Sequence, residues 1–417
     1  MLEMIDLEKA ERLALAEIKP VKTEKVFLKD SHGRVLARPV TALLDIPPFD
    51  RSPLDGYALK GEDTGADLPV ELRVIGEVPA GTNFLGHVDR GKTVKILTGS
   101  PLPTGANAVI RQEDTECAAQ PGFVRILKCI LPGANISRRG EDIQAGETLL
   151  AAGKGLTPAA IGVLASQGIS KVSVFARPMV AIASTGDELV NVEGRLNPGQ
   201  IYNSNYYTLA AMVREWGGQA LPLGLVRDKV EDLAAAIRRG LDSADLVVTT
   251  GGASVGSYDV TLQAMQSAGV RVLFRRIAMK PGTPVICGQK DGKLVIGLSG
   301  NPAAAMISAS LLLGPAVRKL AGWTAYFPRK IKSVSEASFG KSSGVRRLIR
   351  ASAGWHDGKF TVRFPQQQQP GVLKSMLGTN ALVDLPPGNT IECGQIVQVF
   401  LLDEWRDSND AGNLDCG

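Results

Sequence analysis

Residues 245–259 read Asp-Leu-Val-Val-Thr-Thr-Gly-Gly-Ala-Ser-Val-Gly-Ser-Tyr-Asp, an apolar run that ends in glycines and hydroxyls. The β-branched run from Leu246 to Thr250 is typical of a strand buried on both faces of a parallel sheet. Glycines let backbone N–H groups approach an anion closely, and hydroxyls add donors. Because ligands of open α/β sheets bind at the carboxyl ends of strands, the stretch predicts a site for a phosphate-like ligand beside a carboxylate.

The spacing of these glycines matches neither common nucleotide fingerprint, G-x-G-x-x-G or G-x-x-x-x-G-K-[ST]. A glycine-rich surface turn without a ligand therefore stays an alternative. A second loop argues against it, since residues 184–188 read Ser-Thr-Gly-Asp-Glu and follow a predicted strand that begins at Val180. In a parallel sheet both loops leave the same edge. Together they would offer donors for phosphate oxygens and carboxylates for a divalent cation.

Composition limits the class of protein. A chain of 417 residues, 44% of them hydrophobic, is long enough for about two to four domains. It has no apolar run near the roughly 20 residues of a membrane helix, and its acidic start is unlike a signal peptide, so we expect a cytoplasmic protein without a membrane contact. The net charge of +5 suits an anionic small molecule and does not require a nucleic acid. Five scattered cysteines and three histidines favour reduced thiols and Mg²⁺ over a soft-metal site.

The patterning divides the chain. Residues 6–18 have helical spacing, and the stretch from about Val26 to Val40 is strand-like. Residues 68–140 alternate short apolar runs with Gly and Pro turns, which is typical of an all-β lobe. Strand–helix alternation predicts a doubly wound sheet over about 177–322, and short strands return after Pro328.

Other segments combine acids, hydroxyls and cations. The loop 48–58 contains Asp55, residues 97–113 begin with Leu-Thr-Gly-Ser-Pro, residues 138–142 read Arg-Arg-Gly-Glu-Asp, and two cations precede a Pro-Gly turn in 276–282. Each has an ordinary structural explanation, such as an Asp-Gly turn or a solvated charge cluster. Arginine pairs and helix starts also bind oxyanions, so a functional explanation stays open for each.

A series of motifs follows one another along nearly the whole chain. In order they are Ser52-Pro-Leu-Asp-Gly-Tyr-Ala, Leu97-Thr-Gly-Ser-Pro-Leu-Pro, Arg139-Gly-Glu-Asp, Ser184-Thr-Gly-Asp-Glu-Leu, Pro198-Gly-Gln-Ile-Tyr-Asn-Ser-Asn, Thr250-Gly-Gly-Ala-Ser-Val-Gly, Lys280-Pro-Gly and Gly300-Asn-Pro. The series resembles the MoeA family of molybdopterin molybdenumtransferases, which is similar to the E domain of gephyrin.

The resemblance implies an α/β multidomain fold and a homodimer. Its parts would be a mixed α/β linker domain at 1–46 and 141–176, a β-rich lobe at 47–140, a doubly wound molybdopterin-binding domain at 177–327 and a C-terminal small β-barrel domain at 328–417. The resemblance also implies the reaction. Adenylylated molybdopterin, handed over by an adenylyltransferase, and molybdate would be the substrates, Mg²⁺ would assist, and AMP would leave.

The resemblance implies two groups of site residues by motif position. The catalytic group is Asp55, Asp142, Glu188, Asp259, Lys280 and Arg276. The cofactor-binding group is Thr98, Thr185, Gly186, Asp228, Gly251, Gly252, Ser254, Arg350 and Ser375. Glu188 and Asp259 would bind the metal, while Asp55 and Asp142 would close the site from the partner subunit.

Some positions depart from the family pattern. Arg276 stands where a lysine is common, Thr283 follows Lys-Pro-Gly where a lysine or arginine is often seen, and Ser299 replaces the usual proline. A tungstate-preferring enzyme is therefore one alternative. An adenylyltransferase that performs the preceding step is a second, although the β-rich lobe and C-terminal domain favour the insertion step. A scaffold without chemistry is a third, and the acids retained at the site argue against it.

Overall fold

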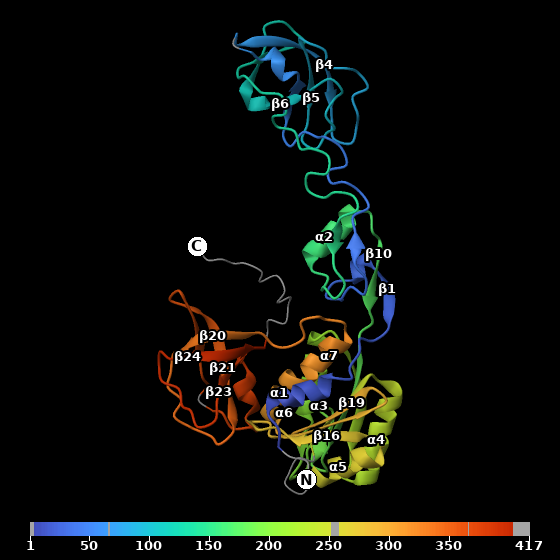
Figure 1. Ribbon diagram of the computed structural model, residues 1–417, viewed down its shortest axis with the longest axis vertical. Helices are drawn as coiled ribbons and strands as arrows, with labels where there is room; N and C mark the ends of the chain where they lie inside the picture. The colour runs from blue at the N-terminus through green and yellow to red at the C-terminus, as the bar shows by residue number, and fades with distance from the viewer. Residues whose placement is uncertain (1–3, 66, 252–257, 366, 403–417) are drawn as a thin grey trace. The chain divides into compact units, whose positions relative to one another are not determined.

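The computed structural model describes residues 4–65, 67–251, 258–365 and 367–402, with only the backbone of Tyr258 and Asp259 (Figure 1). Contacts divide the chain into two compact units. Unit 1 comprises residues 1–38, 152–161 and 170–417, and unit 2 comprises 39–151 and 162–169.

A six-stranded sheet with the order β14-β11-β15-β19-β18-β16 forms the centre of unit 1. Its strands are β11 (Met179–Thr185), β14 (Gln219–Val226), β15 (Leu246–Thr250), β16 (Arg271–Arg276), β18 (Pro284–Lys290) and β19 (Lys293–Leu298). Strands β11, β14, β15 and β19 are parallel to one another, as the strand–helix alternation predicted. Strand β18 is antiparallel to both neighbours, because the two-residue turn Asp291-Gly292, with φ of 50° and 77°, reverses the chain between β18 and β19.

Helices cover both faces of this sheet, which makes it doubly wound. They are α1 (Leu7–Leu15), α3 (Ser204–Glu215), α4 (Val230–Ser243), α5 (Tyr258–Ser267), α6 (Pro302–Ser308) and α7 (Gly314–Leu320). Alternate residues of β11 point to opposite cores. Val180 and Ile182 pack in a core with α1, α3, α6 and α7, while Ala181 and Ala183 pack with α4 and α5. Burying each large apolar side chain contributes about 1.5–3 kcal/mol, so the two cores fix the sheet between its helix layers.

The register of the parallel strands sets the position of the loops that follow them. Ser184 pairs with Thr250, and Thr250 pairs with Leu298. The loops after β11, β15 and β19 therefore leave the same edge of the sheet. Strands β14 and β15 lie on opposite sides of β11, so this edge includes the topological switch point where open α/β sheets bind ligands.

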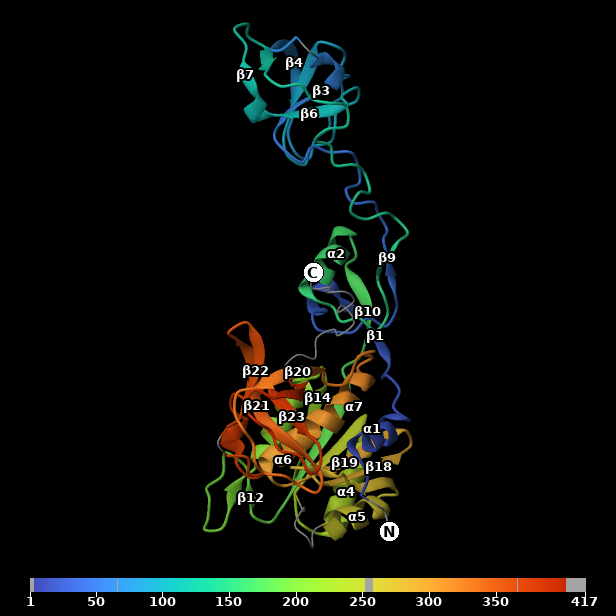
Figure 2. The ribbon, with the colours of Figure 1, turned by 60° about the vertical axis from the view of Figure 1, so that its left-hand side comes forward.

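The C-terminal part of unit 1 is a small closed barrel, as expected (Figure 2). Its strands are β20 (Lys330–Ser335), β21 (Arg346–His356), β22 (Lys359–Arg363), β23 (Ala381–Leu385) and β24 (Ile396–Leu401). The barrel closes because β21 pairs with both β22 and β23. Strand β21 also pairs in parallel with the short β17 (Met279–Lys280), which precedes β18. A strand ladder thus ties the barrel to the doubly wound sheet.

The N-terminal part of unit 1 differs from one expectation. Thr23–Phe27 forms strand β1, which pairs antiparallel with β10 (Lys171–Phe175), and the next strand, β2 (Val40–Thr41), begins only at the end of the predicted run and pairs with β9 (Thr148–Leu150). A 3-10 turn at Leu28–Asp30 interrupts the predicted run to Val40, and Val35 makes only an isolated bridge to Gly155. The sequence pattern missed the break because its apolar residues lie on both sides of this turn.

The part of unit 2 at 47–140 is a β-rich lobe, as its Gly and Pro turns predicted. Its six-stranded sheet has the order β6-β3-β5-β4-β8-β7. The strands are β3 (Gly56–Leu59), β4 (Val70–Val78), β5 (Lys92–Ile96), β6 (Ala108–Arg111), β7 (Thr115–Cys117) and β8 (Phe123–Ile126). All lie within the predicted 47–140 lobe, while α2 (Pro158–Ser166) spans the division between the two units. The exact domain boundaries stay a prediction.

One described helical stretch, Pro302–Leu320, is long and apolar enough to cross a membrane by length and composition. It consists of α6, a π-helical segment at Ala309–Leu313 and α7. In its most apolar 18-residue segment, 89% is buried inside the protein. The helix therefore has the character of a core helix, since it packs under the doubly wound sheet.

Gly251→Ala is expected to lower the free energy of unfolding by about 2–4 kcal/mol. Gly251 has a φ of 103°, and a Cβ there would stand 1.8 Å from the carbonyl oxygen of Thr185. Urea unfolding measures the change. Gly354→Ala is the matched control in unit 1, because its Cβ would meet nothing within 4 Å. Equal stability of the two variants would show that the close approach of these loops is not required.

Candidate functional site

A cleft of about 680 Å³ lies at the edge of the sheet where β11, β15 and β19 end. We call it the strand-end cleft. Its lining residues are Thr185, Gly186, Glu188, Leu189, Ile201, Tyr202, Asn203, Ser204, Asn205, Asp228, Thr250, Gly251, Ser299, Gly300, Asn301, Pro302 and Gly371. Four predicted cofactor-binding residues, Thr185, Gly186, Asp228 and Gly251, are among them, together with Glu188. The structure therefore brings these five together.

Glycines let the three loops of this cleft approach one another. Gly251 stands so close to the Thr185 carbonyl that a side chain would collide with it, and a Cβ at Gly300 would lie 3.3 Å from the Cα of Gly251. Side chains at these positions would push the loops apart. The floor of the cleft is consequently built from backbone, a surface suited to close contact with a phosphate group.

Asn205 is a site residue that sequence reasoning missed. This buried side chain lies in the first turn of α3, and its Nδ2 donates to Thr250 Oγ1 at 2.9 Å and to the Gly300 carbonyl at 3.0 Å. It thereby links the ends of β15 and β19. The motif Pro198-Gly-Gln-Ile-Tyr-Asn-Ser-Asn contained this residue. Its function was hidden because both partners are distant in sequence.

Two carboxylates, Glu188 and Asp228, line the strand-end cleft, and a third, Asp187, is close enough to influence Asp228. Thr185 Oγ1 donates to Asp228 Oδ1 at 3.4 Å. Burial raises the pKa of Asp228, and the negative charges of Asp187 and Glu188 raise it further. The carboxylate of Glu188 folds over Gly186, where a Cβ would lie 2.6 Å from Glu188 Oε2. Repulsion among these acids is what a cation between them would relieve.

The acids suit a hard cation by type, but they do not form a complete cage. Carboxylate oxygens are the ligands that Mg²⁺ prefers. Within the described residues, however, no group of three or more His, Cys, Asp or Glu side chains is placed to hold a metal ion. A magnesium ion here would therefore take further ligands from water and substrate phosphates, as it commonly does.

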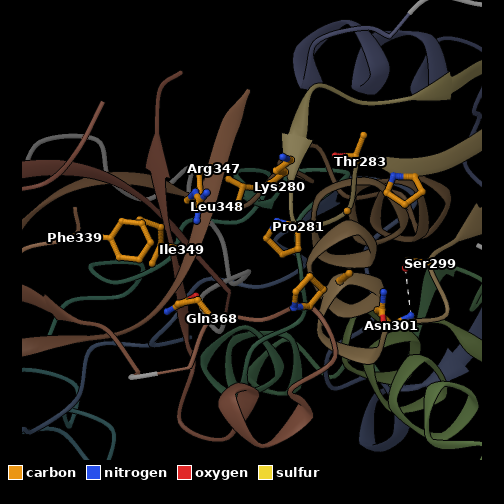
Figure 3. A pocket seen from close by; sticks show the side chains of 14 residues that line it. Lys280, Pro281, Thr283, Ser299, Asn301, Phe339, Arg347, Leu348, Ile349 and Gln368 are labelled. Atoms are coloured by element: carbon orange, nitrogen blue, oxygen red, sulfur yellow. Dashed lines mark hydrogen bonds between the residues drawn. The ribbon is translucent and has the colours of Figure 1, made fainter. Parts of the chain in front are cut away.

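A second pocket, of about 330 Å³, adjoins the strand-end cleft and shares Ser299 and Asn301 with it. We call it the Lys280 pocket. Its lining residues are Lys280, Pro281, Gly282, Thr283, Pro284, Ser299, Asn301, Ala304, Phe339, Arg347, Leu348, Ile349, Gln368 and Pro370. Figure 3 shows Phe339, Ile349 and Gln368 on the barrel side, and Thr283, Ser299 and Asn301 across from them. Two of the three departures from the family pattern, Thr283 and Ser299, thus line the same pocket as Lys280.

Three predicted residues of unit 1 line neither pocket. Arg276 is exposed at the end of β16. Arg350 is fully buried, its Nη2 donates to the carbonyls of Gln367 and Gln369 at 3.3 and 3.1 Å, and burial lowers its pKa. Ser375 is buried too and donates to the Val372 carbonyl. Backbone carbonyls after the barrel strand β22 therefore accept hydrogen bonds from the guanidinium that was predicted to face a cofactor.

The Arg350 guanidinium retains unused donors. Its Nε and Nη1 are buried and have no hydrogen-bond partner among the residues that the structure describes. Gln368 accepts from the Arg350 backbone N–H through Oε1 at 3.1 Å and returns a bond from Nε2 to the Arg350 carbonyl at 3.0 Å. Residues 367–369 thus form a strap over Arg350, and Gln368 of this strap also lines the Lys280 pocket.

Unit 2 contains the remaining described residues of the prediction. Asp55 Oδ1 accepts from the backbone N–H of Thr98 at 2.7 Å and from its hydroxyl at 2.8 Å. These bonds, the backbone one first, hold the pKa of Asp55 below its usual range. Asp142 is exposed, and its backbone N–H donates to the Ile46 carbonyl. Asp55 and Thr98 thus form one pair, which the separate sequence motifs could not predict.

The neighbouring arginines of unit 2 have structural partners. Arg138 pairs with Asp50, and Arg139 pairs with Asp45, each at 2.6 Å. Their charges are therefore compensated locally, as the alternative of a solvated charge cluster expected.

Three further predicted residues, Gly252, Ser254 and Asp259, lie wholly or partly outside the residues that the structure describes. The first two fall in 252–257, and for Asp259 only the helical backbone of α5 is described.

Asp228→Asn is expected to stabilise unit 1 at neutral pH. Because the pKa of Asp228 is raised in the folded state, the native protein binds this proton more tightly than the unfolded chain. Stability therefore falls as the pH rises from about 4 through the raised pKa. The asparagine variant lacks this loss, so its melting temperature should exceed that of the wild type at pH 7.5 and match it near pH 3.5.

Asp242→Asn, an exposed acid at the end of α4, is the control and should leave the pH profile unchanged. A stability difference for Asp228→Asn that is the same at both pH values would contradict the assigned cause.

The sequence matches one family along most of its length. Residues 5–168 match the MoeA N-terminal region (domain I and II), residues 181–319 match a probable molybdopterin binding domain, and residues 332–402 match the MoeA C-terminal region (domain IV). The three matched regions follow one another along the chain without overlap.

Whole proteins are similar to this chain as well. A molybdopterin molybdenumtransferase of Staphylococcus epidermidis is 35% identical over 401 residues, covering 95% of each chain. The protein of the same name from Nostoc is 37% identical over 91% of this chain and 89% of its own. The crystal structure of the molybdopterin biosynthesis moeA protein from Pyrococcus horikoshii superposes with a TM-score of 0.82 at 31% identity, covering 96% of this chain and all of that one. The chain therefore belongs to the MoeA family.

Proposed function

We propose that this chain is a molybdopterin molybdenumtransferase, a transferase of molybdenum cofactor biosynthesis that inserts molybdate into adenylylated molybdopterin and releases AMP. The relatives that share this name cover nearly its whole length. The observation that carries the proposal in structural terms is the continuity of two sites. The strand-end cleft, with its backbone floor and acids, shares Ser299 and Asn301 with the cationic Lys280 pocket.

The strand-end cleft would bind the diphosphate of the adenylylated pterin. Gly186 and Gly251 supply closely packed backbone, and the Thr185 hydroxyl lies at the same edge. The glycine and hydroxyl of Gly252 and Ser254, which continue the same loop in sequence, would extend this cradle. A volume of about 680 Å³ is within the range of small-molecule pockets.

The acids beside the cleft would hold Mg²⁺ against the diphosphate. Glu188 and Asp259 are the proposed ligands, and Asp228 lies next to Glu188 in the cleft lining. When bound, the ion would neutralise the phosphate oxygens and favour departure of AMP. Its charge would also relieve the repulsion among Asp187, Glu188 and Asp228.

The Lys280 pocket would receive the molybdate. The ammonium of Lys280 supplies positive charge, and the Thr283 and Ser299 hydroxyls lie in the same lining. Water would attack a phosphorus of the phosphoanhydride, so that the P–O bond breaks, AMP leaves and the pterin keeps its own phosphate. The two dithiolene thiols would bind molybdenum at the boundary between cleft and pocket, and their protons would leave with one molybdate oxygen as water. Arg276, Arg350 and Ser375 stay proposed contributors, and any contact of Arg350 with substrate requires displacement of the 367–369 strap.

AMP release tests this function. The purified chain with Mg²⁺ and adenylylated molybdopterin is expected to release AMP in a molybdate-dependent manner. Glu188→Gln should lower the rate at least about 10-fold and raise the Mg²⁺ concentration for half-maximal rate, because a proposed metal ligand is lost. Glu193→Gln, an exposed acid of the following loop, is the control. Release of pyrophosphate from ATP and molybdopterin instead would identify the adenylyltransferase alternative.

We also propose a cytoplasmic homodimer in which Asp55, Asp142 and Thr98 complete the site of the partner subunit. The support is the family resemblance and the clustering of Asp55 with Thr98 on unit 2. Handover of the adenylylated substrate from an adenylyltransferase belongs to the same proposal. Sedimentation should give a mass about twice 44.1 kDa.

Mixing Asp55→Ala with Glu188→Gln protein should raise AMP release well above that of either variant alone, because a mixed dimer contains one intact site. A monomeric mass, or no recovery on mixing, would contradict the shared site.

A further inference from the structure

Two cations stand side by side at the junction of the doubly wound sheet and the barrel. In the parallel pairing of β17 with β21, Lys280 is the register partner of Arg347. Both residues line the Lys280 pocket (Figure 3). Since paired residues of neighbouring strands direct their side chains to the same face, the two positive charges are close neighbours.

Neither cation has a carboxylate partner within the described part of the chain. The adjacent Arg346, by contrast, forms ion pairs with Glu8 and Asp384. The Arg347 Nη2 reaches only the Ser342 carbonyl, at 3.5 Å, and its guanidinium lies over the Phe339 ring, 5.6 Å from the ring centroid. Its Nε is buried and makes no hydrogen bond to any described residue. Arg347 thus keeps donors that the protein does not use.

Like charges at paired positions destabilise a sheet unless an opposite charge compensates them. The pocket beside them provides room for such a charge, with a volume of about 330 Å³, and adds the Thr283 and Ser299 hydroxyls and the Gln368 amide. Phe339 and Ile349 add apolar side chains to the lining, and less polar surroundings strengthen electrostatic attraction. This volume leaves room for a small oxyanion beside the two cations.

We propose that Arg347 is a second oxyanion-binding residue, which holds the incoming tetrahedral dianion together with Lys280. The proposal rests on the function given above, in which that dianion is molybdate. A guanidinium offers a planar fork of donors, whereas the ammonium of Lys280 acts as a point charge, so the pair would fix both position and orientation of the anion. The ladder between β17 and β21 keeps the two cations at a constant separation.

The test measures AMP release against molybdate concentration at saturating adenylylated molybdopterin. Arg347→Gln should raise the half-saturating molybdate concentration roughly 10- to 100-fold, the loss expected for a hydrogen bond between charged groups. Arg347→Lys should show a smaller rise, since it keeps the charge without the fork. Arg363→Gln, an exposed barrel arginine paired with Glu336, is the matched control and should match the wild type.

A double variant that moves the positive charge to another position in the pocket tests the same role of Arg347. Thr283 lines the same pocket, so Thr283→Lys in the Arg347→Gln background should restore much of the molybdate affinity. Circular dichroism confirms folding of each variant, and Arg347→Lys carries the test if the glutamine variant does not fold.

The outcomes separate the two proposals. Wild-type protein without molybdate-dependent AMP release would overturn the proposed function. Active wild type with an unchanged half-saturating molybdate concentration in both Arg347 variants would overturn the role of Arg347 alone. If the Arg347 variants changed only the inhibition by added AMP, the role of Arg347 in oxyanion binding would also be overturned. Arg347 would then bind the phosphate of the leaving AMP and not the oxyanion.

Discussion

The site depends on one backbone contact, the approach of Gly251 to the Thr185 carbonyl. No other residue type fits there, since a Cβ would lie 1.8 Å from that oxygen. The parallel register of β11, β15 and β19 brings the two positions to the same edge, and Asn205 ties the end of β15 to the loop after β19. Packing of the two cores holds the strands, and the strands in turn hold the loops. A phosphate site built from backbone needs this rigidity, because its donors cannot adjust as side chains can.

A second constraint is the short ladder between β17 and β21. Through it a barrel strand reaches the turn that contains Lys280. The Lys280 pocket therefore has one wall from each domain, and it meets the strand-end cleft at Ser299 and Asn301. Two sites with different chemistry, one rich in backbone and acids and one cationic, become neighbours. The proposed transfer of a metal oxyanion to a pterin beside a diphosphate would use such an arrangement.

Much of this could be predicted from the sequence. The apolar run ending in Gly251 and the Ser-Thr-Gly-Asp-Glu loop predicted a shared edge, and the pairing of Ser184 with Thr250 confirms it. The family resemblance predicted the closed C-terminal barrel and the gathering of Thr185, Glu188 and Asp228. The described cysteines are free, in agreement with the expected thiols.

What the sequence could not reveal depends on contacts between distant segments. Asn205 binds groups far along the chain, and Arg347 becomes a neighbour of Lys280 only through a strand pairing between domains. Arg350 was predicted to face a cofactor, yet the 367–369 strap covers it. The antiparallel β18 likewise follows from a local two-residue turn that the helix–strand alternation did not include. Motif position identifies a residue type, but packing decides which surface it faces.

A crystal structure of the chain with Mg²⁺, adenylylated molybdopterin and molybdate, with anomalous data at the molybdenum edge, tests the account most directly. The diphosphate is expected in the strand-end cleft between Gly186 and Gly251, and an anomalous peak is expected in the Lys280 pocket. A diphosphate bound elsewhere on the chain, with the strand-end cleft empty, would contradict it.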